Sequence, residues 1–510
     1  MVAAILLPLA ARVRLLDVPL ERDEGEYAYM GQLMLRGIAP YKVAANMKLP
    51  GASAAYAAAM SIFGQTATGI HLGLLMVNLA AIALIYLIGR KLFRPAAGLV
   101  AAASYAALSV SPGVLGIWAH ATHFVVFPAL GAILLLLYWN ESRRDQLLLC
   151  SGLLFGIAFL MKQPGILFAV FGAAFLVYRN WRAAPRNLAI FGAAAALPFG
   201  LMCFGLWGAG VFERFWFWTF TYARLYGSMQ SFSDGLAAFG AVFSHIAAEN
   251  WAILALAAAG ILATWKEKAR RSQALFLTAF LAFSFLAVCP GLYFREHYFV
   301  LLLPAIALFA GASVTLAQKH VAAFLPWIAL VAITFSVLAQ GDFLFEWTPL
   351  QISRRTFGIN PFPEAIEIAA YIKAHSGEND RIAIVGSEPE IYFYASRQSV
   401  TPYVYIYSMM EPHPFALRMQ EEFIKDIEVA KPEYIVMVNV SPSWLRKPSS
   451  PTRLAEWLPA FVESGYALVG VADIGRDQTT YRWDADTLYF TPRFANTVVV
   501  FRRQRPKVGS

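Results

Sequence analysis

Long apolar runs joined by short charged connections dominate residues 1–345 and constrain the fold most strongly. The chain is 59% hydrophobic and 14% charged, whereas about 25% of the residues of a soluble domain are charged. Runs of this length approach the thickness of a bilayer. They fall at residues 2–19, 69–88, 96–113, 123–139, 146–161, 165–179, 187–208, 251–265, 273–289, 298–316 and 321–340. We therefore expect a mostly α-helical, polytopic membrane protein with about 11 transmembrane helices.

Two of these runs are unusual. Arg12 and Arg14 interrupt the first one, so either they extend outward to the membrane surface or the start of the helix is truncated, which we favour. Lys162-Gln-Pro-Gly165 separates the runs 146–161 and 165–179. Pro-Gly is typical of a turn, which predicts a tight helical hairpin.

Basic residues gather in alternate connections between the runs, and the positive-inside rule makes their side cytoplasmic. They are Arg90, Lys91, Arg94, Arg143, Arg144, Arg179, Arg182, Arg186, Lys266, Lys268, Arg270, Arg271 and Lys319. The opposite, extracytoplasmic side then receives residues 20–68, 114–122, 209–250 and 290–297, the turn at Lys162 and the C-terminal region.

The C-terminal region has no further run of membrane length. We divide the chain into a transmembrane domain, 1–345, and an extracytoplasmic α/β domain, 346–510. Apolar β-type segments alternate there with amphipathic helical ones, which predicts a parallel sheet with helices packed against it. The strands are expected at 381–386, 434–439 and 467–472, and the helices at 363–376, 414–430 and 454–464.

The net charge and the cysteines exclude other classes of function. A formal charge of +9 is compatible with nucleic-acid binding in a soluble protein, but here the short loops between membrane segments carry much of it. Cys150, Cys203 and Cys289 lie far apart within apolar segments. Their spacing fits no metal-binding pattern, so we expect packing residues.

Asp23, Glu24 and Glu26 form a dense carboxylate cluster between the first two predicted membrane segments. The residues that follow, 27–36, have the apolar spacing of a helix lying in the membrane surface, with Asp23 as its N-terminal cap. Capping alone explains the cluster as well as catalysis does. Charge between membrane helices is also costly without a function. Glu26 is expected to lie on the solvated face.

Lys48 precedes Leu49-Pro50-Gly51 at the start of the next apolar segment. A cation at headgroup level either anchors the chain in the interface or binds a lipid phosphate. Glycosyl transfer from a lipid phosphate requires a carboxylate that accepts a proton and a cation that holds the leaving phosphate. Asp23 and Lys48 offer this pair of groups.

Three segments taken together resemble a known class of membrane enzyme. Asp23-Glu24 followed by Tyr27, Gly37, Tyr41 and Lys48-x-Pro50 is similar to the opening of GT-C polyprenyl-phosphate-sugar-dependent glycosyltransferases, relatives of protein O-mannosyltransferases and lipid A aminoarabinose transferases (glycosyltransferase family 39-like). Residues 152–165 and 295–311 resemble two further segments of that class. The C-terminal stretches 382–394 and 431–435 resemble its appended soluble domain.

The resemblance implies a membrane glycosyltransferase that moves a hexosyl or pentosyl group from a polyprenyl-phosphate donor to a hydroxyl of a lipid, glycan or protein. The site would face outward from a bacterial inner membrane, with 20–68 as the catalytic loop. The implied roles are catalytic for Asp23 and Glu24, donor phosphate-binding for Lys48, Lys162 and Arg295, and substrate-binding for Tyr27, Tyr41, His297 and Tyr298. For Lys162, Arg295 and His297, simple anchoring at headgroup level is an equal alternative.

The connection 114–122 departs from the pattern, because relatives place an acidic residue there and this chain offers only His120, with His123 just beyond. We expect a hydrogen-bonded interfacial histidine pair and no metal or other cofactor, although a divalent metal is compatible with the motifs. The aromatic run 212–222 favours an interfacial belt, with sugar stacking as the alternative.

Two other classes of function remain as alternatives. A transporter or flippase of a lipid-linked sugar also keeps charges within a helix bundle, but the paired repeats common in transporters are not evident. A membrane-anchored binding or sensory protein would work through residues 350–510, which leaves the carboxylate cluster unexplained.

Overall fold

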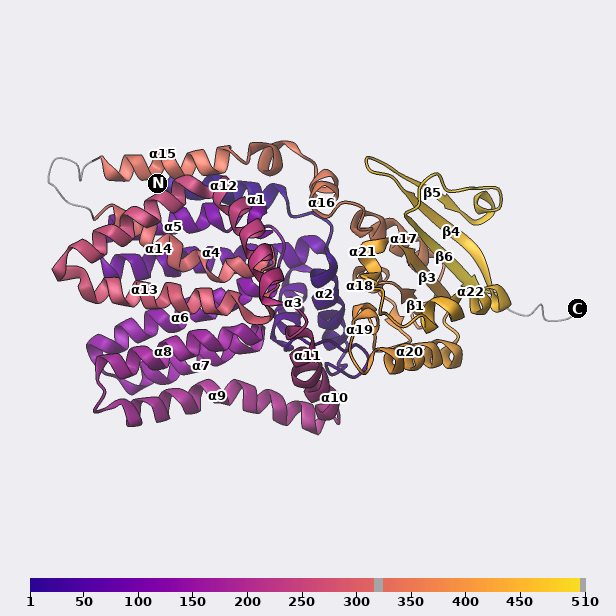
Figure 1. Cartoon of the computed structure of the whole chain (residues 1–510), viewed down its shortest axis with the longest axis horizontal. Coiled ribbons are helices and arrows are strands. Elements are labelled where there is room, and N and C mark those ends of the chain that lie inside the picture. The colour runs from indigo at the N-terminus through magenta and orange to yellow at the C-terminus, as the bar shows by residue number, and fades with distance from the viewer. Residues whose placement is uncertain (316–323, 505–510) are drawn as a thin grey trace, which may run out of the picture.

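The computed structural model describes residues 1–315 and 324–504, which form a helical bundle and a smaller sheet-containing domain (Figure 1). The helices of the bundle run mostly along its long axis, and the C-terminal domain lies against one end of the bundle. Met1 lies toward the opposite end. Some residues named in the sequence analysis lie outside the described residues: Lys319 and the parts of our predicted segments at 316, 321–323 and 505–510.

The bundle contains a helix for each predicted apolar run. Its helices are α1 (Val2–Arg14), α2 (Arg22–Leu35), α3 (Gly51–Phe63), α4 (Ala67–Leu92), α5 (Pro95–Leu108), α6 (Ala121–Ser142), α7 (Asp145–Met161), α8 (Ile166–Arg179), α9 (Ala184–Gly208), α10 (Phe212–Trp216), α11 (Ala223–Gly227), α12 (Phe232–Lys266), α13 (Arg271–Val288), α14 (Leu303–Ser313) and α15 (Leu325–Leu338). A π-helical segment, Phe217–Tyr222, joins α10 to α11, and 3₁₀ turns include Pro112–Val114, Pro290–Leu292 and Glu296–Leu301.

The protein is a multi-pass membrane protein by the length and composition of its helices. Within the described residues, five helices are long and apolar enough to cross a bilayer: Ala67–Leu92, Ala121–Ser142, Ala184–Gly208, Phe232–Lys266 and Lys268–Val288. Six shorter apolar helices accompany them. Some predicted runs are shortened because their ends form loops. The run 298–316, for example, begins in the 3₁₀ turn Glu296–Leu301 rather than in α14.

Arg12 is buried inside the bundle, which rules out the alternative that it extends to the membrane surface. Its guanidinium donates hydrogen bonds to the carbonyl oxygens of Gly116, at 2.8 Å, and of Ser109. It also approaches the Asn78 side chain at 3.4 Å. A buried charge is tolerated where several acceptors surround it, and Arg12 thereby ties α1 to the connection that precedes α6.

The C-terminal domain is built on a six-stranded sheet with the order β2-β1-β3-β6-β4-β5. Its strands are β1 (Arg381–Val385), β2 (Gln398–Ser399), β3 (Tyr434–Asn439), β4 (Tyr466–Ile474), β5 (Thr479–Trp483) and β6 (Thr497–Arg503). Its helices are α16 (Pro349–Phe357), α17 (Phe362–Ala374), α18 (Pro389–Ala395), α19 (Tyr407–Met410), α20 (Ala416–Ala430), α21 (Ser441–Trp444) and α22 (Arg453–Gly465).

The predicted parallel arrangement of strands is found in only half of the sheet. β2, β1 and β3 are parallel, with Ile382 opposite Tyr434, because α20 supplies the crossover that parallel strands require. β6 then pairs antiparallel with both β3 and β4, and β4 pairs antiparallel with β5. The sheet is therefore mixed.

Close packing of α2 on α18 joins the domain to the bundle. A Cβ on Gly25 would lie 2.6 Å from the backbone nitrogen of Glu390, so only glycine permits this approach. Arg22 forms an ion pair of 3.0 Å with Glu388, and the Tyr29 hydroxyl accepts a hydrogen bond of 2.8 Å from the Ser399 backbone. The carboxylate cluster therefore lies at the junction of the two parts.

The cap of α2 differs from the one we predicted. The helix begins at Arg22, and Glu21, not Asp23, is its N-cap, in a reciprocal capping box with Glu24. Because Glu21 and Glu24 satisfy the backbone donors at this helix start, Asp23 is available for other contacts.

Candidate active site

Lys48 lies between two carboxylates of the cluster. Its Nζ is 2.8 Å from Oδ1 of Asp23 and 2.7 Å from Oε2 of Glu26. Asp23 and Glu26 are three residues apart on α2, which places them on one face of the helix. Glu26 is only 1% exposed, so the expectation of a solvated Glu26 is wrong.

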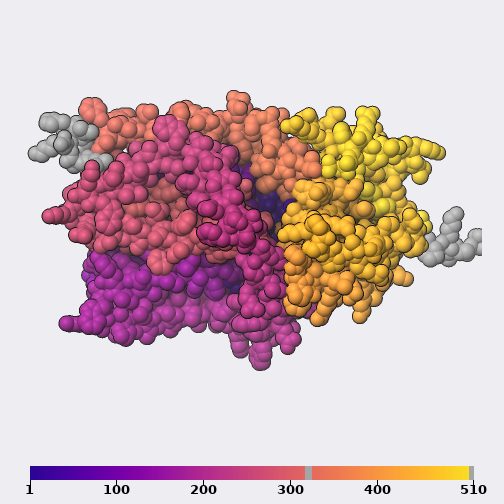
Figure 2. All heavy atoms as spheres, viewed as in Figure 1, coloured from indigo at the N-terminus to yellow at the C-terminus, as the bar shows by residue number. Residues whose placement is uncertain are grey.

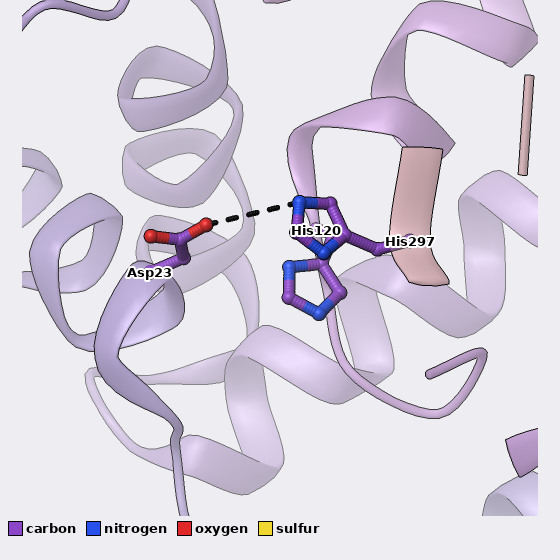
Figure 3. Close-up of side chains that lie close together, drawn as sticks. All are labelled: Asp23, His120 and His297. Carbon is purple, nitrogen blue, oxygen red and sulfur yellow. Dashed lines mark ion pairs between the residues drawn. The ribbon is translucent and has the colours of Figure 1, made fainter. Parts of the chain in front are cut away.

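The two oxygens of Asp23 have different neighbours. Oδ1 contacts Lys48 and accepts a hydrogen bond of 3.1 Å from the hydroxyl of Tyr405, in the C-terminal domain. Oδ2 faces Nε2 of His297 at 3.9 Å (Figure 3). Burial by itself would raise the pKa of Asp23, but the Lys48 ammonium outweighs it and holds that pKa well below its ordinary value. Asp23 is therefore ionised, and its Oδ2 makes no direct hydrogen bond to another of the described residues.

Hydrogen bonds to the backbone fix the loop that carries Lys48. The Tyr41 hydroxyl donates to the carbonyl oxygen of Lys48 at 2.7 Å, and Asn46 Oδ1 accepts from the Lys48 amide at 2.8 Å. A Cβ on Gly51 would meet the carbonyl oxygen of Leu160 at 2.3 Å. This close contact brings the loop against the end of α7, next to Lys162.

Two further cations lie near Asp23. The Nζ of Lys162 lies 3.9 Å from the ring centroid of Tyr298, and Arg295 donates a hydrogen bond of 3.2 Å to the hydroxyl of Tyr226. Burial lowers the pKa of Lys162 to about 7, with the charges of Lys48 and Arg295 adding to the effect. Neither cation has an ion-pair partner within 4.0 Å among the described residues, so both can bind an anion.

His120 and His297 stack face to face beside Asp23, with ring centroids 4.0 Å apart (Figure 3). Burial lowers the pKa of His120 to about 4 and holds that of His297 well below its usual value. Both rings are neutral at pH 7. Both nitrogens of His120 and Nδ1 of His297 are buried without hydrogen-bond partners in the part of the chain that the structure describes, as are both nitrogens of His123, so the expected hydrogen-bonded pair of His120 with His123 is wrong.

Asp23, His120 and His297 fit a divalent cation. Each offers one ligand atom, and these atoms lie within 4.8 Å of one another. Neutral imidazole nitrogens with a carboxylate are typical ligands of Zn²⁺, and one of the unpartnered nitrogens of His120 gains a partner when a metal binds.

Two cavities meet at these side chains. The first, of about 230 Å³, lies under the C-terminal domain and is lined by Tyr405, Tyr407 and Glu411. The second, of about 220 Å³, is lined by Lys162, Tyr298 and apolar residues such as Leu301. Both are lined by Asp23, Met47, Lys48, Tyr226, Arg295 and His297. Figure 2 shows a recess between the bundle and the domain, with N-terminal residues at its floor.

The structure brings most of the site residues expected from the sequence to this junction, but not all of them. Tyr27 lines the second cavity, where Lys48 lies 4.5 Å from its ring centroid. Tyr41 lines neither cavity and supports the Lys48 loop. Glu24 also lines neither, and its carboxylate is 3.0 Å from His71. Glu24 therefore lies outside both cavities, in contacts typical of a structural residue.

Sequence reasoning did not identify Glu26, Tyr226 and Tyr405 as site residues. The i, i+3 spacing of Asp23 and Glu26 on one predicted helix was a usable signal. Tyr226 and Tyr405 come from distant segments, and nothing in the local sequence marks them.

Comparison with known proteins agrees with this architecture. Residues 48–207, from Lys48 to the end of α9, match the family described as dolichyl-phosphate-mannose-protein mannosyltransferase. No curated protein sequence matches the chain significantly.

Solved structures share the fold over nearly the whole chain. ArnT from Cupriavidus metallidurans, bound to undecaprenyl phosphate, matches with a TM-score of 0.61 and 16% identity over 98% of this chain and 97% of its own. A second match is the oligosaccharyltransferase AglB from Archaeoglobus fulgidus, in complex with an inhibitory peptide and a dolichol-phosphate. Its TM-score is 0.56 and its identity 12%, over 98% of this chain and 75% of its own. The Archaeoglobus fulgidus oligosaccharyltransferase in complex with Zn and sulfate matches with a TM-score of 0.56 and 14% identity. The match covers 94% of this chain and 72% of that one.

The chain therefore has the GT-C fold, a multi-helix membrane bundle with an appended C-terminal domain that contains a sheet. The resemblance to GT-C glycosyltransferases that the sequence motifs predict is confirmed.

Proposed function

We propose that the protein is a membrane glycosyltransferase that transfers a hexosyl or pentosyl group from a polyprenyl-phosphate donor to a hydroxyl of a lipid, glycan or protein. The observation that carries this proposal is the position of Asp23, an ionised carboxylate surrounded by cations where two cavities meet. Two substrates that enter from different sides would react at this point. The family match and the shared fold support the same activity.

The donor occupies the second cavity. Its polyprenyl chain follows apolar residues such as Leu301, and its phosphate lies among Lys48, Lys162 and Arg295. When the bond between the sugar and the phosphate oxygen breaks, negative charge grows on the leaving polyprenyl phosphate. Cations held at that place stabilise the charge most in the transition state, which accelerates the reaction.

The acceptor enters through the first cavity, under the C-terminal domain. Its hydroxyl oxygen attacks the anomeric carbon of the sugar while Oδ2 of Asp23 accepts the hydroxyl proton. Tyr405 and Lys48 hold Oδ1 and so orient the carboxylate. The negative charge of the bound donor phosphate offsets the positive charge of Lys48 at Asp23, which makes the carboxylate a better base in the complex.

A divalent cation would bind at Asp23, His120 and His297, where it would add positive charge beside the transferred group. Proton transfer to Oδ2 of Asp23 would use the metal-free site, because a carboxylate oxygen that coordinates a cation is a much weaker base. His120 and His297 line the first cavity together with Asp23.

The site faces the extracytoplasmic side of a bacterial inner membrane in this proposal, and the C-terminal domain lies on the same side. The support is the positive-inside pattern of the connections. Polyprenyl-phosphate donor, acceptor and membrane lipids are then the partners of the protein.

Mass spectrometry of cell-envelope glycolipids and glycoproteins, with and without the protein, tests the proposal. We expect one sugar to be missing from one class of acceptor in its absence. The purified protein in proteoliposomes should then restore that sugar from the matching polyprenyl-phosphate donor. An unchanged envelope, together with translocation of the lipid-linked sugar across vesicles without transfer, would instead establish a flippase.

A further inference from the structure

A third cavity, separate from the two that meet at Asp23, lies between the bundle and the C-terminal domain. Its volume is about 640 Å³, within the range typical of ligand-binding pockets. Its walls come from the first loop, from α10 with the π-helical segment after it, and from β1, β2 and α20 of the C-terminal domain. We call it the outer cavity.

The side chains that line the outer cavity and those that line the first cavity have net charges of opposite sign. Five basic and three acidic side chains line the outer cavity, whereas three basic and five acidic side chains line the first cavity. Among the acids of the outer cavity, Glu422 is already engaged by Arg418 at 2.8 Å and by the hydroxyl of Tyr403. Lys42, Arg381 and Lys425 have no ion-pair partner within 4.0 Å among the described residues, so an anion is favoured here.

Aromatic side chains form the boundary that the outer cavity shares with the first cavity. Trp218 and Tyr403 line both cavities, with ring centroids 5.9 Å apart. Phe217 and Phe415 add a second ring pair, 5.2 Å apart, to the outer cavity. Aromatic faces beside polar groups are suited to sugar rings, because one side of a sugar ring is apolar.

The outer cavity lies next to the membrane surface. Its residues Glu213 and Arg214 belong to α10, which begins four residues after the membrane helix α9 ends at Gly208. In Figure 1, α10 lies at the end of α9 that is nearest the C-terminal domain. Trp207 is 68% exposed and Trp216 is 48% exposed, as is typical of an aromatic belt at the membrane interface.

We propose that the outer cavity binds the anionic saccharide head group of a membrane-anchored acceptor. The apolar part of the acceptor stays in the bilayer, and its phosphate or carboxylate lies among Lys42, Arg381 and Lys425. A neutral part of the same head group passes Trp218 and Tyr403 and presents its hydroxyl to Asp23. This inference rests on the proposed glycosyltransferase function and names the class of acceptor.

Binding to the full-length protein in nanodiscs tests the inference with three probes. They are octyl glucoside 6-phosphate, neutral octyl glucoside, and glucose 6-phosphate, which lacks the chain. We expect the phosphorylated glycolipid to bind at least tenfold more tightly than either of the others. Equal binding of the neutral glycolipid, or no binding of the phosphorylated one, overturns the anionic site. Equal binding of glucose 6-phosphate overturns the membrane-anchored acceptor.

Two double variants locate the site. Arg381→Gln with Lys425→Gln should weaken binding of the phosphorylated glycolipid at least tenfold, because both cations line the cavity. Lys373→Gln with Arg453→Gln removes two exposed cations elsewhere on the same domain and should change binding less than twofold. Equal effects of the two double variants would contradict the assignment.

Undecaprenyl phosphate, measured on the same samples, separates this inference from the proposed function. Its affinity should be the same in the wild type and in both double variants, since its phosphate binds at Lys48. Failure of the wild type to bind undecaprenyl phosphate contradicts the proposed function, whatever the glycolipid result. Normal binding of undecaprenyl phosphate with no glycolipid effect contradicts only the outer-cavity acceptor site.

Discussion

Tyr405 of the C-terminal domain donates a hydrogen bond of 3.1 Å to Asp23 at the start of α2. The two residues are separated by most of the chain, and their contact means that the C-terminal domain completes the candidate active site. Tyr405 is a positioning residue, because it acts on the orientation and ionisation of Asp23.

Tyr405→Phe should lower kcat about tenfold or more, because a hydrogen bond to a charged group contributes about 1.5–3 kcal/mol. The affinity for undecaprenyl phosphate should remain unchanged. Tyr434→Phe is the matched comparison, since Tyr434 lines neither cavity and its hydroxyl donates to the His375 carbonyl oxygen at 3.0 Å. We expect it to lower thermal stability rather than kcat. An equal loss of kcat in both variants would contradict the positioning role.

Lys48→Met should weaken binding of undecaprenyl phosphate about tenfold or more, because it removes a charge-assisted contact of about 1.5–3 kcal/mol. Calorimetry on the protein in detergent measures this affinity. Arg36→Gln removes an exposed cation at the end of α2 and should leave the affinity unchanged. Full affinity in Lys48→Met would place the donor phosphate elsewhere.

The pH dependence of donor binding should follow Lys162, whose pKa burial lowers to about 7. The charged form exists below that pH and binds phosphate, so affinity for a polyprenyl phosphodiester should fall as pH rises above 7. A phosphodiester is the correct probe because it does not titrate in this range. Lys162→Arg stays charged and should keep its affinity up to pH 9. Lys162→Met should show weak binding and no pH dependence, and a wild-type profile in this variant would contradict the assignment.

The cluster of Asp23, His120 and His297 should bind one Zn²⁺ per chain. Calorimetry with the metal-free, full-length protein should show this site, and His120→Asn or His297→Asn should abolish it. His123→Asn is the control, because His123 is also a buried histidine but is not part of the cluster. Removal of Zn²⁺ by a chelator should lower the thermal stability of the wild type and of His123→Asn, but not that of His120→Asn or His297→Asn. Identical metal binding in all the histidine variants would exclude this site.

The sequence predicted the helical bundle well because membrane helices need long apolar runs, which are visible without any tertiary information. It also predicted β3 at residues 434–439, a buried run of β-branched residues, with its observed bounds. β6 was not predicted, although it pairs with β3 and β4. Without it, the alternation of strands and helices suggested a parallel sheet.

The candidate site was partly predictable for a similar reason. Asp23 and Lys48 lie in one loop, and topology placed them on one face together with Lys162 and Arg295. The stacking of His120 on His297 joins two connections far apart in the sequence, and Tyr405 comes from another domain. Such contacts depend on the packing of the whole chain. Glu26 was misassigned because its charge suggested solvent, whereas an ion pair with Lys48 allows its burial.

In the proposed reaction, Asp23 accepts the proton of the acceptor hydroxyl. Asp23→Asn keeps the shape of the side chain and removes its basicity, so turnover should fall about 100-fold to 10,000-fold. Binding of undecaprenyl phosphate should persist. Asp17→Asn, at an exposed carboxylate of the same connection, should behave as the wild type.

The most direct measurement is therefore single-turnover transfer by Asp23→Asn in proteoliposomes, with donor affinity measured on the same preparation. We expect bound donor and a rate at least about 100-fold below the wild type, in line with the loss of a general base. Bound donor with a rate within a few-fold of the wild type would contradict this expectation.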